Sequence, residues 1–220
     1  MTPTASDTPG QATSGQATPA QAPGAPAADD GAMLEGVLAG ARALIAAVAT
    51  DALQRPTPCP NFDVQALVEH MVSWLRMFDA GFAGRSGVDP KTLGPGPEPA
   101  TDFADAAASV LRRWRAGGPQ AMVALTGPPT PGPFVYRMMV GEYVVHGWDL
   151  AAATGQPLPF SAEQAEFALA ALREMLQPQY RGGAFGPEVG VPADAAPVDR
   201  LVAFTGRDPR WLPPGHAVER

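Results

Sequence analysis

Three side chains able to bind a cation or move a proton lie close together in GEYVVHGWDL, residues 141–150. Glu142 and His146 are four residues apart, and Asp149 follows three residues after the histidine. If the segment is a helix, His146 and Asp149 lie within about 40° of Glu142 around its axis, on a stripe that also carries large apolar side chains. An unpaired carboxylate on a buried stripe is unfavourable. Either this face is wet, or a cationic group lies on it.

A further candidate ligand is His70, which lies beside Leu67 and Trp74 at the edge of another apolar helical stripe. One histidine and a Glu-x-x-x-His pair on two helices supply three ligands that converge in a bundle core. Such a set holds a divalent ion and leaves positions open for water or substrate. The alternative is that Glu142 and His146 only hydrogen-bond each other, as residues four apart on a helix can.

The elements that must position these residues are predicted to be helices separated by proline-rich breaks. Apolar residues recur at helical spacing. Asp63 is a predicted N-cap, Ser161 and Gln164 form a predicted capping box, and Gly155 ends the helix that carries the opening motif. The predicted helices cover residues 33–52, 64 to about 78, 103 to about 115, 134 to about 153 and 162 to about 176. We therefore predict an all-α fold, a four-helix bundle with one additional helix.

Two segments of unlike composition flank the predicted bundle. Residues 1–32 form an arm rich in Ala, Pro, Gly and Gln, which we predict to be disordered because it offers almost no apolar surface to bury. The arm also lacks the basic and apolar regions of a secretory signal. Residues 33–180 are the predicted bundle, and residues 181–220 are a predicted irregular C-terminal extension packed on it.

Composition narrows the function classes. A net charge of −7 and a pI near 4.9 argue against nucleic-acid binding, which requires a basic surface. The sequence contains no run of 18 apolar residues, so it predicts no membrane span. A single cysteine, Cys59, excludes an internal disulfide and is typical of a reducing cytoplasm. We expect a cytoplasmic protein without nucleic-acid or membrane partners.

The motifs TPCPNFDVQALVEHM (residues 57–71) and GEYVVHGWDLAAATGQ (residues 141–156) occur in an order typical of a known superfamily. The chain resembles the DinB-like and mycothiol-dependent maleylpyruvate isomerase metal-binding proteins, in particular their actinobacterial branch. The tail FGPEVGVPADAAPVDRLVAFTGRDP (residues 185–209) resembles the C-terminal signature of that branch. The resemblance covers roughly residues 33–210. Many relatives have Asp-Trp where this chain has Asn61-Phe62.

The resemblance implies a DinB-like four-helix bundle with a long crossover, in which a divalent metal is held by His70, Glu142 and His146. It implies a metal-dependent thiol transferase or isomerase that uses a low-molecular-weight thiol of the mycothiol type as co-substrate. A bound metal lowers the pKa of a thiol and so makes a thiolate nucleophile available near neutral pH. Two alternatives stay open, a non-catalytic metal-binding module for stress or interaction, and a metal-free bundle in which Glu142–His146 is a structural pair.

The metal is expected to be zinc, because two imidazoles and a carboxylate suit it. Nickel, manganese and iron are the alternatives, since ligand type alone does not choose among them. A small-molecule substrate or thiol is the expected partner. Many members of the superfamily pair up, which makes a homodimer an alternative that no sequence feature indicates.

Other residues near the predicted site have two interpretations each. Cys59 either lies near the metal or, as we prefer, is a small buried residue that fixes a turn. Asp149 either orients His146 or a metal-bound water, or bonds within its own helix. Trp74 and Trp148 either wall a pocket or belong to the core. Arg137 either meets an anionic substrate or, as we prefer, points to solvent.

Overall fold

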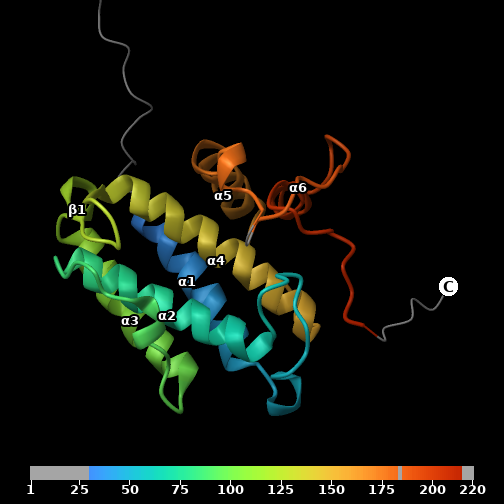
Figure 1. Cartoon of the computed structure of the whole chain (residues 1–220), viewed down its shortest axis with the longest axis horizontal. Coiled ribbons are helices and arrows are strands. Elements are labelled where there is room, and N and C mark those ends of the chain that lie inside the picture. The colour runs from blue at the N-terminus through green and yellow to red at the C-terminus, as the bar shows by residue number, and fades with distance from the viewer. Residues whose placement is uncertain (1–29, 183–184, 215–220) are drawn as a thin grey trace, which may run out of the picture.

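The computed structural model describes residues 30–182 and 185–214, and these are predominantly helical (Figure 1). The helices are α1 (Asp30–Ala46), α2 (Val64–Phe82), α3 (Pro99–Arg115), α4 (Gly132–Thr154), α5 (Ala162–Met175) and α6 (Pro197–Phe204). The connections hold the short 3₁₀ helices η1 (Thr50–Ala52), η2 (Pro90–Thr92), η3 (Gly118–Gln120) and η4 (Pro178–Tyr180). A two-residue strand β1 (Met122–Val123) pairs antiparallel with β2 (Thr130–Pro131). The all-α prediction is confirmed, with this small hairpin added.

Helices α1 to α4 form the bundle. Both α1 and α2 pack against α3 and against α4. The consecutive helices α1 and α2 therefore occupy opposite corners, and residues 47–63 cross one end of the bundle to join them. Helix α5 packs on α4, and α6 packs on α5, so these two form an outer layer on the α4 side (Figure 1). Helix α4 thus has neighbours on several sides, and its core-facing side chains include the fully buried Tyr136, Met139 and Tyr143.

Local sequence signals explain several helix ends. The Asp63 side chain accepts a hydrogen bond from the backbone N–H of Ala66 at 2.8 Å and caps α2. Ser161 and Gln164 form the predicted capping box at the start of α5. Gly155 adopts a left-handed conformation, with φ 71°, directly after α4. These three predicted boundaries are confirmed.

Other boundaries differ from the prediction. Helix α1 ends at Ala46 rather than at residue 52, because Val48, Thr50 and Asp51 are weak helix formers that follow in close succession. Helix α3 begins earlier than predicted, at Pro99, whose fixed φ suits the first turn of a helix. The extension predicted to be irregular contains α6, a helix too short for its periodicity to stand out among prolines and glycines.

The predicted disorder of residues 1–32 falls mainly on residues 1–29, which lie outside the described residues, while residues 30–32 begin α1. No helix in the described part of the chain has the length and apolar character that crossing a membrane requires.

Gly147, between His146 and Trp148 on α4, lets the aromatic ring of Phe160 approach the helix backbone. A Cβ atom at this position would lie 2.5 Å from two ring carbons of Phe160. In an open helix a glycine-to-alanine change stabilises by about 0.5–1 kcal/mol. Here the added methyl overpacks the contact, and we expect Gly147→Ala to lower the free energy of unfolding by about 1–3 kcal/mol.

Urea denaturation measures this difference, with Gly94→Ala as the matched control, because a Cβ at Gly94 meets nothing within 4 Å. The control is expected to stay within about 0.5 kcal/mol of the wild type. A stabilised Gly147→Ala protein would contradict the close contact between Phe160 and α4.

Candidate metal centre

His70 lies on the face of α2 that is turned toward α4. Its ring contacts two aromatic neighbours, with centroid separations of 4.8 Å to Phe62 and 5.6 Å to Trp74. Phe62 is held beside it by the connection 47–63, in which the Thr57 hydroxyl donates to the backbone carbonyls of Cys59 and Phe62 at 3.0 and 2.8 Å. The helix position and the tied loop together fix where the His70 imidazole lies.

Glu142 and His146 lie one turn apart on α4 and meet His70 across the α2–α4 contact. Glu142 Oε1 is 2.7 Å from His70 Nε2 and 3.6 Å from His146 Nε2. The two imidazole rings are 4.9 Å apart, centroid to centroid. The side chains of His70 and Glu142 are 19% and 18% exposed, whereas that of His146 is 6% exposed. The structure thus brings together the three residues that the sequence indicated, with His146 deepest and the other two facing partly outward.

Glu142 and His146 each stabilise the charged form of the other. Burial by itself would raise the pKa of the Glu142 carboxyl, but His146 and His70 outweigh it, and the pKa lies below its usual value. Burial would likewise lower the pKa of His146, but Glu142 and Asp149 outweigh it, and the pKa lies above its usual value. A carboxylate is therefore the stable form of Glu142, as a metal ligand must be.

Asp149 fixes the orientation of His146. Its Oδ2 lies 3.0 Å from His146 Nδ1, so that nitrogen carries the proton when the imidazole is neutral. The other nitrogen, Nε2, is then left with its lone pair directed toward Glu142. Asp149 is fully buried. Of the two sequence interpretations, the bond within the helix is present, and the residue it reaches is His146, so it also orients the ring.

Arg207, a residue that the sequence analysis did not single out, holds Asp149 from the C-terminal extension. Its Nε and Nη2 lie 3.2 and 3.0 Å from the two carboxylate oxygens of Asp149, a bidentate contact between two buried side chains. Burial would raise the pKa of Asp149, but His146 and Arg207 together hold it below its usual value. The sequence indicated that Asp149 on a buried stripe requires a cationic partner, but it did not indicate which residue supplies it.

The turn after α6 aims Arg207 at α4. Gly206 has φ 87°, which favours glycine, and a Cβ there would lie 2.6 Å from Gly186 Cα. The backbone N–H of Arg207 donates a hydrogen bond to the carbonyl of Val202, and the Nη1 of its side chain donates one to the carbonyl of Thr205. The close approach of two backbone segments thus places the guanidinium.

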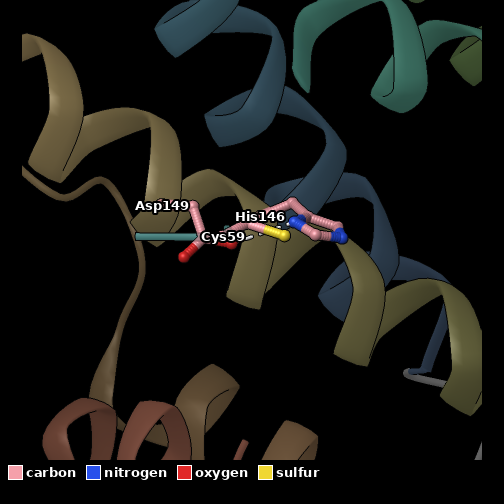
Figure 2. Close-up of side chains that lie close together, drawn as sticks. All are labelled: Cys59, His146 and Asp149. Atoms are coloured by element: carbon pink, nitrogen blue, oxygen red, sulfur yellow. Dashed lines mark hydrogen bonds and ion pairs between the residues drawn. The ribbon is translucent and has the colours of Figure 1, made fainter. Parts of the chain in front are cut away.

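Cys59 lies close to His146 and Asp149, and Figure 2 shows these three side chains together. Ligand atoms of Cys59, His146 and Asp149 lie within 4.8 Å of one another, so they form a second cluster able to meet a cation. This cluster is a poorer site, because the guanidinium of Arg207 already engages both Asp149 oxygens. Burial also raises the pKa of the Cys59 thiol, which disfavours the thiolate that binds metals.

Trp74 lines two cavities that flank the trio. One, of about 330 Å³, has Glu142 and His146 in its wall, and the other, of about 450 Å³, has His70 in its wall. Of its two sequence interpretations, Trp74 therefore matches the pocket wall. Trp148 is buried, and neither of these two cavities is lined by it. Arg137 forms an ion pair with Glu174 at 2.8 Å rather than facing the trio.

The trio fits a divalent ion. Two imidazole nitrogens and a carboxylate are the donor set of many catalytic zinc sites, which keep a position open for water or substrate. Asp149 engages Nδ1 of His146 and leaves Nε2 free to bind an ion. The 3.6 Å between His146 Nε2 and Glu142 Oε1 suits two atoms that bind the same ion. The 2.7 Å contact between His70 and Glu142 is a direct hydrogen bond, which a bound ion would replace.

Comparison with known proteins identifies the family of the chain. Residues 34–151 match the family described as the mycothiol maleylpyruvate isomerase N-terminal domain. Two uncharacterised proteins of Mycobacterium tuberculosis, from strains CDC 1551 and H37Rv, are each 35% identical over 172 residues, 76% of this chain and 92% of theirs. No solved structure matches the chain significantly. The matched region contains all three residues of the trio, and the chain belongs to the mycothiol maleylpyruvate isomerase N-terminal domain family.

Proposed function

We propose that the protein is a metal-dependent thiol transferase or isomerase in which His70, Glu142 and His146 hold a divalent ion, zinc first among the candidates. The observation that carries the proposal is the Glu142 carboxylate placed between two imidazoles, next to open cavities rather than sealed in the core. When bound, the ion supplies Lewis acidity that lowers the pKa of a thiol and provides a thiolate near neutral pH. The family match favours a thiol of the mycothiol type.

The chain's own residues perform the supporting steps. Asp149 keeps the Nδ1 proton of His146 in place, and Arg207 keeps Asp149 ionised and oriented. Phe62 and Trp74 pack against the His70 ring and help to fix its position. The cavities leave room for a thiol and for the molecule that it attacks.

Purified protein from a zinc-replete culture, assayed with mycothiol and 1-chloro-2,4-dinitrobenzene, tests the proposal. The thiolate sulfur forms a bond to the ring carbon, chloride leaves with the electron pair of the carbon–chlorine bond, and the thiol proton goes to solvent. We expect about one metal ion per chain, and adduct formation that begins at lower pH than with metal-free protein. The comparison requires metal analysis and initial rates of adduct formation across pH.

Two outcomes would contradict the proposal and point to different alternatives. Protein without stoichiometric metal would favour the metal-free bundle with a structural Glu142–His146 pair. Stoichiometric metal without any effect on the thiol, with mycothiol or with glutathione as a second thiol, would favour a non-catalytic metal-binding module.

A further inference from the structure

The smaller of the two cavities beside the trio has an almost entirely apolar wall. Met138 and Val145 line it from α4, and Leu172 lines it from α5. Leu176, directly after α5, and Phe185, from the segment that precedes α6, complete this part of the wall. Among the residues that line this cavity, Glu142 and His146 have ionisable side chains. At about 330 Å³ it lies at the lower end of the range for small-molecule sites.

The residues that line this cavity all belong to the described part of the chain, and they include no lysine or arginine. Arg137, next to Met138 in sequence, is paired with Glu174, and Arg207 is engaged with Asp149. A carboxylate ligand would lose its hydration against an apolar wall that offers it no ammonium or guanidinium group, which is unfavourable. In the metal-free protein the cavity therefore favours an uncharged ligand over an anion of the same shape.

The other cavity has a different character. His70, Glu69, Ser73 and Lys91 contribute polar groups to its wall, and Trp74 is shared by both cavities. The trio thus has a cavity with several polar lining residues on the His70 side and a more apolar cavity on the Glu142 and His146 side. Two unlike ligands can approach the same three side chains from different directions.

We propose that the apolar cavity binds an uncharged, apolar molecule about the size of a single aromatic ring, and that this molecule is the electrophile attacked by the thiol. The substrate class named here rests on the proposed function, whereas binding of the apolar molecule does not. A polar thiol would then reach the trio through the cavity lined by His70 and Lys91.

The test uses toluene and benzoate, two ligands of similar shape that differ in charge, with the full-length protein as purified and after metal removal. Saturation-transfer NMR titrations measure both dissociation constants. We expect toluene to bind both forms in the submillimolar range, and benzoate to bind the metal-free protein at least tenfold more weakly. Benzoate binding as tightly as toluene to the metal-free protein, or no toluene binding, would overturn the proposal.

Two variants that fill the cavity from different helices locate the binding site. Met138→Trp on α4 and Met175→Trp on α5 are each expected to weaken toluene binding at least tenfold. Met122→Trp is the matched control, because Met122 lies in β1, 59% exposed and outside the lining residues. Circular dichroism identifies a variant that fails to fold, and the second filling variant then carries the test. Unchanged toluene binding in a folded filling variant would refute the assignment.

Failure of this inference and failure of the proposed function are distinguishable. Toluene binding is measured without thiol and without metal, so a protein that binds toluene but holds no metal overturns only the proposed function. A protein that holds metal and reacts with the thiol but does not bind toluene overturns only the assignment of the apolar cavity.

Discussion

Glu142→Gln is expected to abolish stoichiometric metal binding and, with it, the stabilisation that added zinc gives the wild-type protein. Glutamine keeps the size of the side chain but lacks the negative charge that lies between His70 and His146. Losing a ligand should weaken zinc binding by more than the roughly 10–100-fold that is typical for loss of a residue that only orients a ligand. An ion that binds only the folded state raises the free energy of unfolding by RT ln(1 + [L]/Kd), where [L] is the concentration of free ion and Kd its dissociation constant. Calorimetric titration with zinc and thermal unfolding with and without EDTA measure both effects.

Glu69→Gln is the matched control for this substitution. Glu69 precedes His70 on α2, is exposed, and accepts a hydrogen bond from Gln65 at 3.0 Å. The same chemical change one residue from the site is expected to leave the zinc affinity and the zinc-dependent shift in unfolding temperature as in the wild type. Equal zinc stabilisation of the Glu142→Gln and Glu69→Gln proteins would show that Glu142 holds no metal.

A second pair of variants separates the two clusters that share His146. His70→Ala removes a ligand from the trio and leaves Cys59, His146 and Asp149 unchanged. Cys59→Ser removes the thiol from the second cluster and leaves His70, Glu142 and His146 unchanged. If the trio is the site, zinc binding is lost in the first variant and retained in the second. The opposite result would assign the ion to Cys59 and its neighbours, and would require Arg207 to give up its contact with Asp149.

The sequence predicted part of this site because helical periodicity is a local property. Glu142, His146 and Asp149 share a face wherever α4 lies, since 3.6 residues per turn fixes their relative directions. That His70 faces them depends on α1 and α2 taking opposite corners of the bundle, so that α2 packs against α4. Periodicity does not determine that choice. The residue pattern suggested the converging trio, and the family resemblance strengthened that prediction.

Features that arise from tertiary packing could not be predicted in this way. Arg207 is 58 residues from Asp149 and follows a short helix in a segment without clear periodicity. Its direction depends on the approach of Gly206 to Gly186, which no sequence window contains in a recognisable form. The apolar cavity likewise depends on where α5 and Phe185 lie relative to α4. The periodic elements were predictable, whereas the contacts between them were not.

Arg207→Met is expected to destabilise the protein and to weaken metal binding at the same time. Removing one partner of a buried ion pair leaves Asp149 without the guanidinium that neutralises it, which typically costs about 3–5 kcal/mol. Asp149 then no longer has a fixed position from which to hold the Nδ1 proton of His146. Loss of such an outer partner typically lowers metal affinity by about 10–100-fold. Urea denaturation and zinc titration of the same preparations measure the two effects.

Arg210→Met is the control for this substitution, because Arg210 is 88% exposed and pairs with Asp208 on the surface. It is expected to change the free energy of unfolding by no more than about 0.5 kcal/mol and to leave zinc affinity unaltered. A comparable loss of stability or affinity in both variants would show that the effect of Arg207→Met is not specific to the Asp149 contact.

Two double variants distinguish a positioning role of Arg207 from a purely structural one. Asp149→Leu with Arg207→Met removes both charges, and replacing a buried ion pair by apolar side chains often restores stability. His146 then has no acceptor for its Nδ1 proton, so we expect zinc affinity to stay low although the protein is stable again. Asp149→Asn with Arg207→Met keeps a carbonyl acceptor for that proton, and we expect it to recover part of the affinity. Recovery of full zinc affinity in the leucine double variant would mean that Arg207 acts on stability alone, and that the orientation of His146 comes from the packing of α4 itself.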